Sequence, residues 1–283
     1  MIRKHRPKGL IRYPGLIEAA RGVVRIEKKD PDEPELILTL RGRGDMKREE
    51  NRGCIGEIGM PLPQMLRQVH SRRVVWACKE GGIEEGGKEA GREGDWKKTD
   101  AEGEIRSSGR PETEADGLLS ADRGVSLGVT VADCMPIYLF TSDCRRGKDD
   151  QKNWVFGVLH SGWQGTGIVK DALDLMRRRR GIEAETVSAV LGPSIRSCCY
   201  KVDGERGDLF SSLWGEKTVR FDKKKREASL DLVEANLGIL RGEGVEDIRV
   251  VESCTCCDTR FGSFRREGPE TFTHMLAMIG FLK

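Results

Sequence analysis

A series of apolar runs in the second half of the chain constrains its fold most. From residue 125 to residue 131 every second residue is apolar, which is the period of a β-strand. Continuous apolar runs predict four further strands, at 137–140, 154–159, 187–191 and 248–251. We therefore expect a β-sheet at the core of the protein.

Two amphipathic segments predict helices. From Ile168 to Met176 apolar residues recur on one helical face, with Thr166 as the expected N-cap and Gly181 as the expected end. The four arginines at 177–180 then fall in the last turn, where cations interact favourably with the helix dipole. We attribute this basic run to a solvated helix end rather than to a binding partner. A second helix is expected from about residue 230 to residue 240.

These elements predict the fold class α/β, with a mixed β-sheet core and flanking helices in a single domain over residues 1–283. One segment, residues 79–114, differs in composition because Gly, Glu, Lys, Arg and Asp dominate it. Such a segment buries too little apolar area to offset its ordering entropy, so we expect a flexible charged insertion. Candidate site residues lie on both sides of it, which argues against a domain boundary. A role as an active-site lid stays open.

Composition excludes several classes of protein. The chain has 49 basic and 46 acidic residues, and a net charge of +3 provides no electrostatic footprint for nucleic acid. We find no apolar stretch near the ~20 residues of a membrane span, and no apolar signal core after the basic residues 1–7. Without an export signal, the nine cysteines are expected to be reduced thiols. We therefore expect a cytoplasmic protein without nucleic-acid or membrane partners.

Two of the four histidines lie in compact motifs, and a cysteine lies between them in the sequence. These residues are His70, Cys134 and His160, each close to an apolar run. Two histidines and one cysteine can form a three-ligand metal site with an open position, which is typical of a catalytic zinc. The alternative is that each is a buried residue without a metal. Asp133 is next to Cys134 and is a candidate to orient a ligand or to accept a proton.

Three other motifs have both a functional and a structural interpretation. The turn Gly162–Gly167 links a predicted strand to a predicted helix, so it either binds an anion such as phosphate or is a plain tight turn. Arg265 and Arg266 either grip a phosphate or carboxylate or form a solvated basic turn. The cysteines at 198–199 and 254–257 suggest a second metal site, with packing as the alternative. Neighbouring cysteines on a strand point to opposite faces, so we expect at most one of each neighbouring pair to contribute.

Together these motifs resemble the YfiH-like family, whose members are variously called laccase-domain, polyphenol oxidase or purine nucleoside phosphorylase proteins. The resemblance covers most of the chain from about residue 35 onward and keeps the family's order of motifs. The matching stretches are Gly44-Asp45, Asn51-Arg52, Gln68-Val69-His70-Ser71, Ala115-Asp116-Gly117-Leu118, Val131-Ala132-Asp133-Cys134-Met135-Pro136, His160-Ser161-Gly162-Trp163-Gln164-Gly165, Leu191-Gly192-Pro193-Ser194-Ile195, Cys198-Cys199-Tyr200, Leu230-Asp231-Leu232, Asn236, Cys254-Thr255 and Phe261–Arg266.

The resemblance implies a single α/β domain and implies that His70, Cys134 and His160 are metal ligands. The chain departs from the family pattern in three places. Gln164 stands where the family usually has arginine, and the insertion at 79–114 is much longer than usual. Thr273 and His274 occupy the vicinity of an expected Gly-Arg pair, which places substrate binding near the C-terminus in doubt.

The family's two kinds of label imply different chemistry, either copper-dependent phenol oxidation or purine nucleoside phosphorolysis with adenosine deamination. A multicopper oxidase needs about ten histidine ligands, and the chain has four histidines. Zinc on two histidines and one cysteine fits better, with copper as the alternative metal. Nucleoside and phosphate are the expected small-molecule partners of a monomer or small homo-oligomer. The residues expected around them are Arg52, Gln68, Gly162, Trp163 and Arg265.

Three alternative functions stay open. A copper-dependent polyphenol oxidoreductase is the activity with which the family is often labelled. A hydrolase acting on cell-wall precursors would use Cys134 as a thiolate nucleophile, with His70 or His160 as the base. A protein that binds a metal or ligand without turnover is the non-enzymatic alternative.

Overall fold

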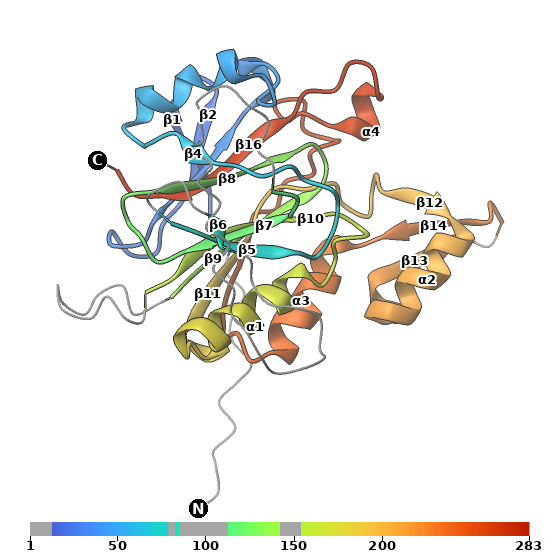
Figure 1. Cartoon of the computed structure of the whole chain (residues 1–283). Coiled ribbons are helices and arrows are strands. Elements are labelled where there is room, and N and C mark those ends of the chain that lie inside the picture. The colour runs from blue at the N-terminus through green and yellow to red at the C-terminus, as the bar shows by residue number, and fades with distance from the viewer. Residues whose placement is uncertain (1–12, 79–82, 85–112, 142–153, 223, 283) are drawn as a thin grey trace, which may run out of the picture.

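Three stacked layers, two β-sheets and one layer of helices, make up the body of the protein (Figure 1). The computed structural model describes residues 13–78, 83–84, 113–141, 154–222 and 224–282. Most of the charged segment 79–114 therefore lies outside the described residues. The predicted mixed α/β architecture is confirmed, although the strands form three sheets rather than one.

A six-stranded sheet forms the upper layer in Figure 1. Its strands pair antiparallel, except for one parallel pair, between Pro63–Gln64 at the edge and Ser126–Val131. In spatial order its strands are β1 (Leu16–Ala20), β2 (Val23–Ile26), β3 (Glu35–Thr39), β16 (Met275–Gly280), β8 (Ser126–Val131) and β4 (Pro63–Gln64).

A seven-stranded mixed sheet forms the middle layer. Its central strands are buried along their whole length because the other sheet covers one face and helices cover the other. In spatial order its strands are β15 (Asp247–Val250), β11 (Val187–Leu191), β9 (Met135–Thr141), β10 (Phe156–Ser161), β7 (Gly117–Ser120), β5 (Val74–Ala77) and β6 (Ile83–Glu84).

Two hydrophobic clusters hold the layers together. One lies between the two sheets, where the buried hydroxyl of Tyr138 donates to the Ile37 carbonyl across the interface at 3.0 Å. The other joins the middle sheet to α1 (Ile168–Arg180) and α3 (Leu232–Gly242), which pack side by side beneath it (Figure 1). Among the described residues, no helix has the length and apolar character needed to cross a membrane.

A smaller part of the fold projects from one side of the layers, to the right in Figure 1. It contains the three-stranded sheet and the helix α2 (Gly204–Trp214), which packs on that sheet. Its strands are β12 (Lys201–Asp203), β14 (Glu227–Leu230) and β13 (Val219–Asp222). The short helix α4 (Phe264–Glu267) lies near the start of β16 in the sequence.

The predicted strands and helices are confirmed apart from their ends. The strand predicted at 187–191 has those bounds, and the other four differ by at most two residues at either end. Thr166 was wrong as the N-cap, because α1 begins one residue after Gly167 and the Thr166 hydroxyl donates to the Gly162 carbonyl instead. The second helix begins after Asp231, whose carboxylate caps it by accepting from the backbone N–H groups of Val233 and Glu234.

Candidate metal centre

His70, Cys134 and His160 come together at one edge of the middle sheet. His70 lies in the segment before β5, Cys134 in the turn between β8 and β9, and His160 within β10. Their potential ligand atoms all lie within 4.8 Å of one another, and the two imidazole rings have centroids 4.9 Å apart. Two imidazoles and a thiol at these separations fit the donor set of a zinc ion that keeps one position open.

The strand register explains why these residues meet. In the β9–β10 pair His160 lies opposite Pro136, two residues after Cys134. In the β7–β10 pair Leu159 lies opposite Gly117, so His160 is also next to Asp116, whose carbonyl accepts from the His160 backbone N–H at 2.7 Å. The sheet therefore brings the cysteine and a carboxylate to opposite sides of one histidine.

Two site residues adopt a backbone conformation that is uncommon outside glycine. His70 has φ 58° and Asp133 has φ 82°, both in the left-handed region. Hydrogen bonds stabilise both: the His70 N–H donates to Asp116 Oδ1 at 3.1 Å, and Asp133 accepts from the Thr255 hydroxyl and the Arg265 N–H, each at 2.7 Å. A strained backbone persists only where the surrounding structure holds it in place, and such residues cluster at functional sites.

Asp116 is a residue of the candidate site to which the sequence assigned no role. Its carboxylate is fully buried and accepts from the backbone N–H groups of Val69, His70 and Ser71, from the Ser71 hydroxyl, and from the His160 ring. The distance from Asp116 Oδ1 to His160 Nδ1 is 2.8 Å, which leaves Nε2 as the ring nitrogen available to a metal. Histidine ligands commonly donate their other N–H to a carboxylate in this way.

The Asp116 carboxylate is charged in this setting. Burial opposes its ionisation, but hydrogen bonds from His160 and Ser71 lower its pKa below the ordinary value. Asp133, the carboxylate predicted to orient a ligand, instead contacts Thr255 and Arg265. Asp116 belongs to the sequence motif Ala115-Asp116-Gly117, but its distance from His160 along the chain gave no reason to pair the two residues.

Without a metal, Cys134 and His160 form a thiolate–imidazolium pair. Burial alone would raise the pKa of Cys134, but the charge of His160 and hydrogen bonds from His160 and His70 lower it to about 6. Burial alone would lower the pKa of His160, whereas Cys134 and Asp116 raise it to about 9. The thiolate, which is the form that binds metals, is therefore the prevailing form of Cys134 at neutral pH.

Alkylation of Cys134 in the metal-free protein is expected to titrate near pH 6. Thiolates react with iodoacetamide and thiols do not, so the rate falls as the pH falls through the pKa of about 6. We expect His160→Ala to move the midpoint upward, because it removes the main opposing charge. Mass spectrometry of the Cys134 peptide measures the rate. A midpoint near 9.0, the ordinary value for a thiol, would contradict the pairing.

Gly162 provides space for the thiol. A β-carbon at this position would lie 2.9 Å from Cys134 Sγ and 3.8 Å from the His70 ring. The first distance is shorter than a normal contact, so any side chain here displaces the sulfur. Gly162 thus lines the candidate site by close approach of its backbone.

We expect Gly162→Ala to weaken metal binding by at least about tenfold, because the added methyl group displaces the sulfur of one ligand. A tenfold loss of affinity corresponds to about 1.4 kcal/mol of binding free energy. Competition with a colorimetric zinc chelator measures the affinity. Gly238→Ala is the matched control: a β-carbon there meets nothing within 4 Å, and alanine favours the interior of α3. Equal zinc affinities in the two variants would show that the space at Gly162 is not needed.

A cavity of about 490 Å³ opens in front of the cluster. Its wall combines apolar and aromatic surface with several cationic side chains, a composition that suits a flat ring system carrying an anion. The lining residues are Lys47, Gln68, His70, Thr130, Ala132, Asp133, Cys134, His160, Gly162, Trp163, Gln164, Ile195, Tyr200, Arg206, Leu232, Phe264, Arg265, Phe272 and His274.

Four of the five residues expected around a substrate line this cavity. Gln68 is held by Thr130, which donates through N–H and hydroxyl and accepts from the Gln68 amide. Trp163 lies with the Arg206 guanidinium 4.9 Å from its ring centroid, and Arg265 is held by the carbonyls of Cys199 and Lys201. Gly162 is the fourth.

The structure does not bring Arg52 to the cavity. Its guanidinium donates to the carbonyls of Met46 and Lys47, at 2.9 and 3.2 Å, and so supports the loop before the 3₁₀ segment Glu49–Ile58. Lys47, from the loop that Arg52 supports, does line the cavity. A motif match located the correct loop, but it did not distinguish the residue facing the cavity from the residue behind it.

Gln164 and His274, two of the positions that depart from the family pattern, face the cavity. Gln164 is exposed there, and His274 contacts Asp45 with 3.2 Å between Nδ1 and the carboxylate. Burial lowers the pKa of His274, so its imidazole is neutral at pH 7. The cavity therefore has a glutamine and a neutral histidine at these two positions.

The fold and the cluster together define an α/β protein with a His–Cys–His site at the edge of its central sheet. The sequence profile described as multi-copper polyphenol oxidoreductase laccase matches residues 44–281, and the chain belongs to this family. The crystal structure of YlmD from Geobacillus stearothermophilus is similar over 95% of this chain and 100% of that one, with a TM-score of 0.74 and 25% identity.

Three curated relatives have names that indicate activity on purine nucleosides. Purine nucleoside phosphorylase YlmD of Geobacillus stearothermophilus is 33% identical over 58% of this chain and 59% of its own length. Purine nucleoside phosphorylase LACC1 of Mus musculus is 32% identical over 60% of this chain and 40% of its own length. Adenosine deaminase RL5, from an unknown prokaryotic organism, is 32% identical over 54% of this chain and 57% of its own length. The chain thus spans about two fifths to three fifths of these relatives.

Proposed function

We propose that this protein is a zinc-dependent enzyme of purine nucleosides. The proposed reactions are phosphorolysis of adenosine- and inosine-type nucleosides to base and ribose 1-phosphate, and deamination of adenosine. The convergence of His70, Cys134 and His160 on the wall of the cavity is the observation that carries this proposal. The names of the relatives support the same class of substrate.

In this proposal His70, Cys134 and His160 hold the zinc ion, and Asp116 orients His160 from behind. When bound, zinc supplies a Lewis acid that polarises an oxygen atom in the cavity. Cys134 is suited to bind it because the thiol ionises near pH 6. His160 is suited because Asp116 determines which ring nitrogen faces the cavity.

The cavity wall supports binding of a nucleoside and phosphate. The half-buried Trp163 presents an aromatic surface against which a purine stacks. Arg265, Arg206 and Lys47 supply positive charge for phosphate. Asp133 accepts from the Arg265 backbone N–H, so we assign Asp133 the positioning of Arg265 rather than proton transfer.

The two reactions differ in the bond that breaks. In phosphorolysis a phosphate oxygen forms a bond to C1′ of the ribose, the bond from C1′ to N9 of the purine breaks, and the base leaves with a proton. In deamination a water oxygen adds at C6 of the purine and the amino group leaves as ammonia. Both require a positioned oxygen nucleophile next to the bound nucleoside, which this cavity can hold.

A cysteine hydrolase is the second candidate function. The lowered pKa of Cys134 and the raised pKa of His160 describe the ion pair of a cysteine nucleophile and its base. Such an enzyme would act on cell-wall precursors without a metal. Chelator-resistant activity that iodoacetamide abolishes would favour this function over the zinc enzyme.

Product analysis by chromatography tests the proposed function. Zinc-quantified protein is incubated with adenosine, with and without phosphate, beside His160→Ala. We expect phosphate-dependent adenine and phosphate-independent inosine, both lost in the variant. Unchanged adenosine with zinc bound would overturn the proposal and favour a protein that binds metal without turnover. Cys78→Ser is the control, because it changes a residue that belongs to neither candidate metal cluster.

The free cysteines support a cytoplasmic location. Each of the eight cysteines that the structure describes is free, and reduced thiols persist in the cytoplasm. We propose that location, and a monomer or small homo-oligomer with nucleoside and phosphate as partners.

A further inference from the structure

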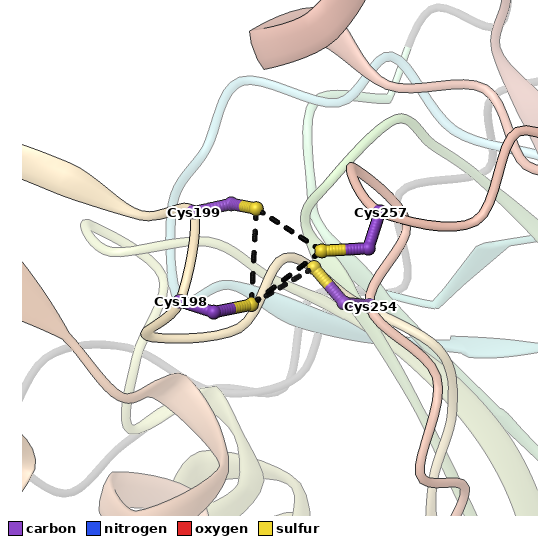
Figure 2. A group of neighbouring side chains, drawn as sticks. All are labelled: Cys198, Cys199, Cys254 and Cys257. Atoms are coloured by element: carbon purple, nitrogen blue, oxygen red, sulfur yellow. Dashed lines mark hydrogen bonds between the residues drawn. The ribbon is translucent and has the colours of Figure 1, made fainter.

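Four cysteines form a second cluster outside the cavity. Cys198 and Cys199 lie in the turn before β12, and Cys254 and Cys257 lie in the loop after β15. Their four sulfur atoms lie within 4.8 Å of one another and point toward a common centre (Figure 2). We propose that these four cysteines form a second metal site, which binds one structural zinc ion through four thiolates.

The distances between the sulfur atoms match a tetrahedral site. Zinc–sulfur bonds of about 2.3 Å place the sulfurs of a tetrahedron about 3.8 Å apart. The Sγ atom of Cys198 lies 3.7, 3.6 and 3.7 Å from those of Cys199, Cys254 and Cys257, and the Cys199–Cys257 distance is 3.3 Å. Four sulfur ligands in a tetrahedron are typical of zinc or iron–sulfur centres, and a closed four-ligand site is typical of structural zinc.

The backbone of both segments suits this arrangement. Cys254 and Cys257 have the two-residue spacing of a zinc knuckle, and the Asp258 N–H donates to the Cys254 carbonyl at 2.9 Å to close that turn. Backbone N–H groups of Arg196 and Cys257 are directed at the sulfur of Cys254, and such donors stabilise a thiolate that binds a metal.

Cys198 and Cys199 both contribute, contrary to the expectation for neighbouring cysteines. That expectation holds for a strand, but here the Cys199 and Tyr200 N–H groups both donate to the Arg196 carbonyl at 2.9 Å, which makes a tight turn. The turn directs both sulfurs to one side (Figure 2). In the other segment Cys257 belongs to the cluster, and its neighbour Cys256 does not.

Two arginines bind the backbone of the two cysteine-containing segments. Arg266 donates to the carbonyls of Thr255 and Cys256, at 2.7 and 3.0 Å, and Arg265 donates to the Cys199 carbonyl at 3.2 Å. Four thiolates and one zinc ion carry two net negative charges, and Arg265 is placed to offset part of this charge, whereas Arg266 is paired with Glu267 at 2.7 Å. The nearest acidic neighbour in the loop, Asp258, is paired with Arg260 at 2.7 Å.

A zinc ion here would link two segments that both contact the cavity wall. The turn supplies the carbonyl of Cys199 to Arg265, and the loop supplies the hydroxyl of Thr255 to Asp133 at 2.7 Å. The two segments are also joined directly, by backbone hydrogen bonds of Ser194 with Ser253 and Thr255 and by the Arg196 guanidinium, which donates to the Val251 carbonyl. The second site is therefore expected to stabilise the wall of the cavity without touching a substrate.

Zinc content per chain, measured by plasma mass spectrometry on reduced protein, tests this inference. We expect two zinc ions in the wild type and in Cys78→Ser, and one in Cys134→Ala. We expect one also in the double variant Cys254→Ser with Cys257→Ser. The Cys134→Ala variant tests the zinc ion of the candidate catalytic site, and the double variant tests the zinc ion of the four-cysteine site. The two proposals can therefore fail independently. A single zinc in the wild type that Cys134→Ala removes entirely would overturn the second site, and iron in its place would overturn the assignment to zinc.

Cobalt loading of Cys134→Ala leaves the four cysteines unchanged, so this test does not depend on the folding of variants in the cluster. We expect one cobalt ion per chain, with tetrahedral d–d bands and the strong charge-transfer absorption of a four-thiolate site. No such absorption, or an unreduced intact mass lower by two hydrogens because two of the cysteines have formed a disulfide, would overturn the inference.

Discussion

Cys134→Ala is expected to remove zinc from the candidate catalytic site and to lower kcat/KM for adenosine by about 10³-fold or more. A metal ion contributes several kcal/mol to transition-state stabilisation, and each 1.36 kcal/mol corresponds to a factor of ten. The thiol is the one sulfur ligand of the cluster, and two histidines alone hold zinc weakly. Steady-state kinetics on metal-quantified protein measure the change.

Cys78→Ser controls this experiment because it also removes one thiol, at the end of β5 and outside both cysteine-containing clusters. We expect its kcat/KM to stay close to that of the wild type, because the half-buried Cys78 belongs to neither cluster and does not line the cavity. If Cys134→Ala retained zinc and turnover, His70, Cys134 and His160 would not be the catalytic metal centre.

Asp116→Asn is expected to lower zinc affinity or kcat by about 10- to 100-fold, the usual effect of altering the hydrogen-bond partner of a histidine ligand. The asparagine amide carries one oxygen and one NH₂ group. It therefore cannot accept from the backbone N–H groups of His70 and Ser71 and from the His160 ring as the carboxylate does. The ring of His160 loses the partner that determines its orientation. Isothermal titration with zinc, and kinetics at saturating zinc, separate the two effects.

Asp133→Asn is the matched comparison, since Asp133 is also a buried carboxylate beside the cluster. Its partners are the Thr255 hydroxyl and the Arg265 N–H, so we expect a rise in KM for phosphate with zinc affinity retained. If Asp133→Asn lost zinc and Asp116→Asn kept it, the roles assigned to the two carboxylates would be reversed.

The sequence predicted the elements that carry their own periodicity. The strands β8 to β11 and the helices α1 and α3 were found because each buries one face or its whole length, and burial determines the apolar pattern. The helix α2 and the three-stranded sheet were not predicted. The exposed Leu209 and Leu213 of that helix lie among polar residues, which obscures its apolar face.

The candidate ligands could be predicted because histidine is rare in this chain, whereas the contacts around them depend on the packing of distant segments. Asp116 reaches His160 through the register of β7 and β10, which no local motif reveals. Arg52 was predicted to contact the substrate because it is associated with a loop that does reach the cavity. Its side chain, however, donates to the backbone of that loop. The orientation of Cys198 and Cys199 depends on a turn that the residue order alone did not show.

Adenosine turnover by metal-depleted protein, measured as zinc is added back, tests the central claim most directly. We expect no turnover in the depleted wild-type protein, recovery with zinc, and no recovery in Cys134→Ala at any zinc concentration. Turnover that persists without metal and is abolished by iodoacetamide would contradict the zinc enzyme and would make Cys134 a nucleophile.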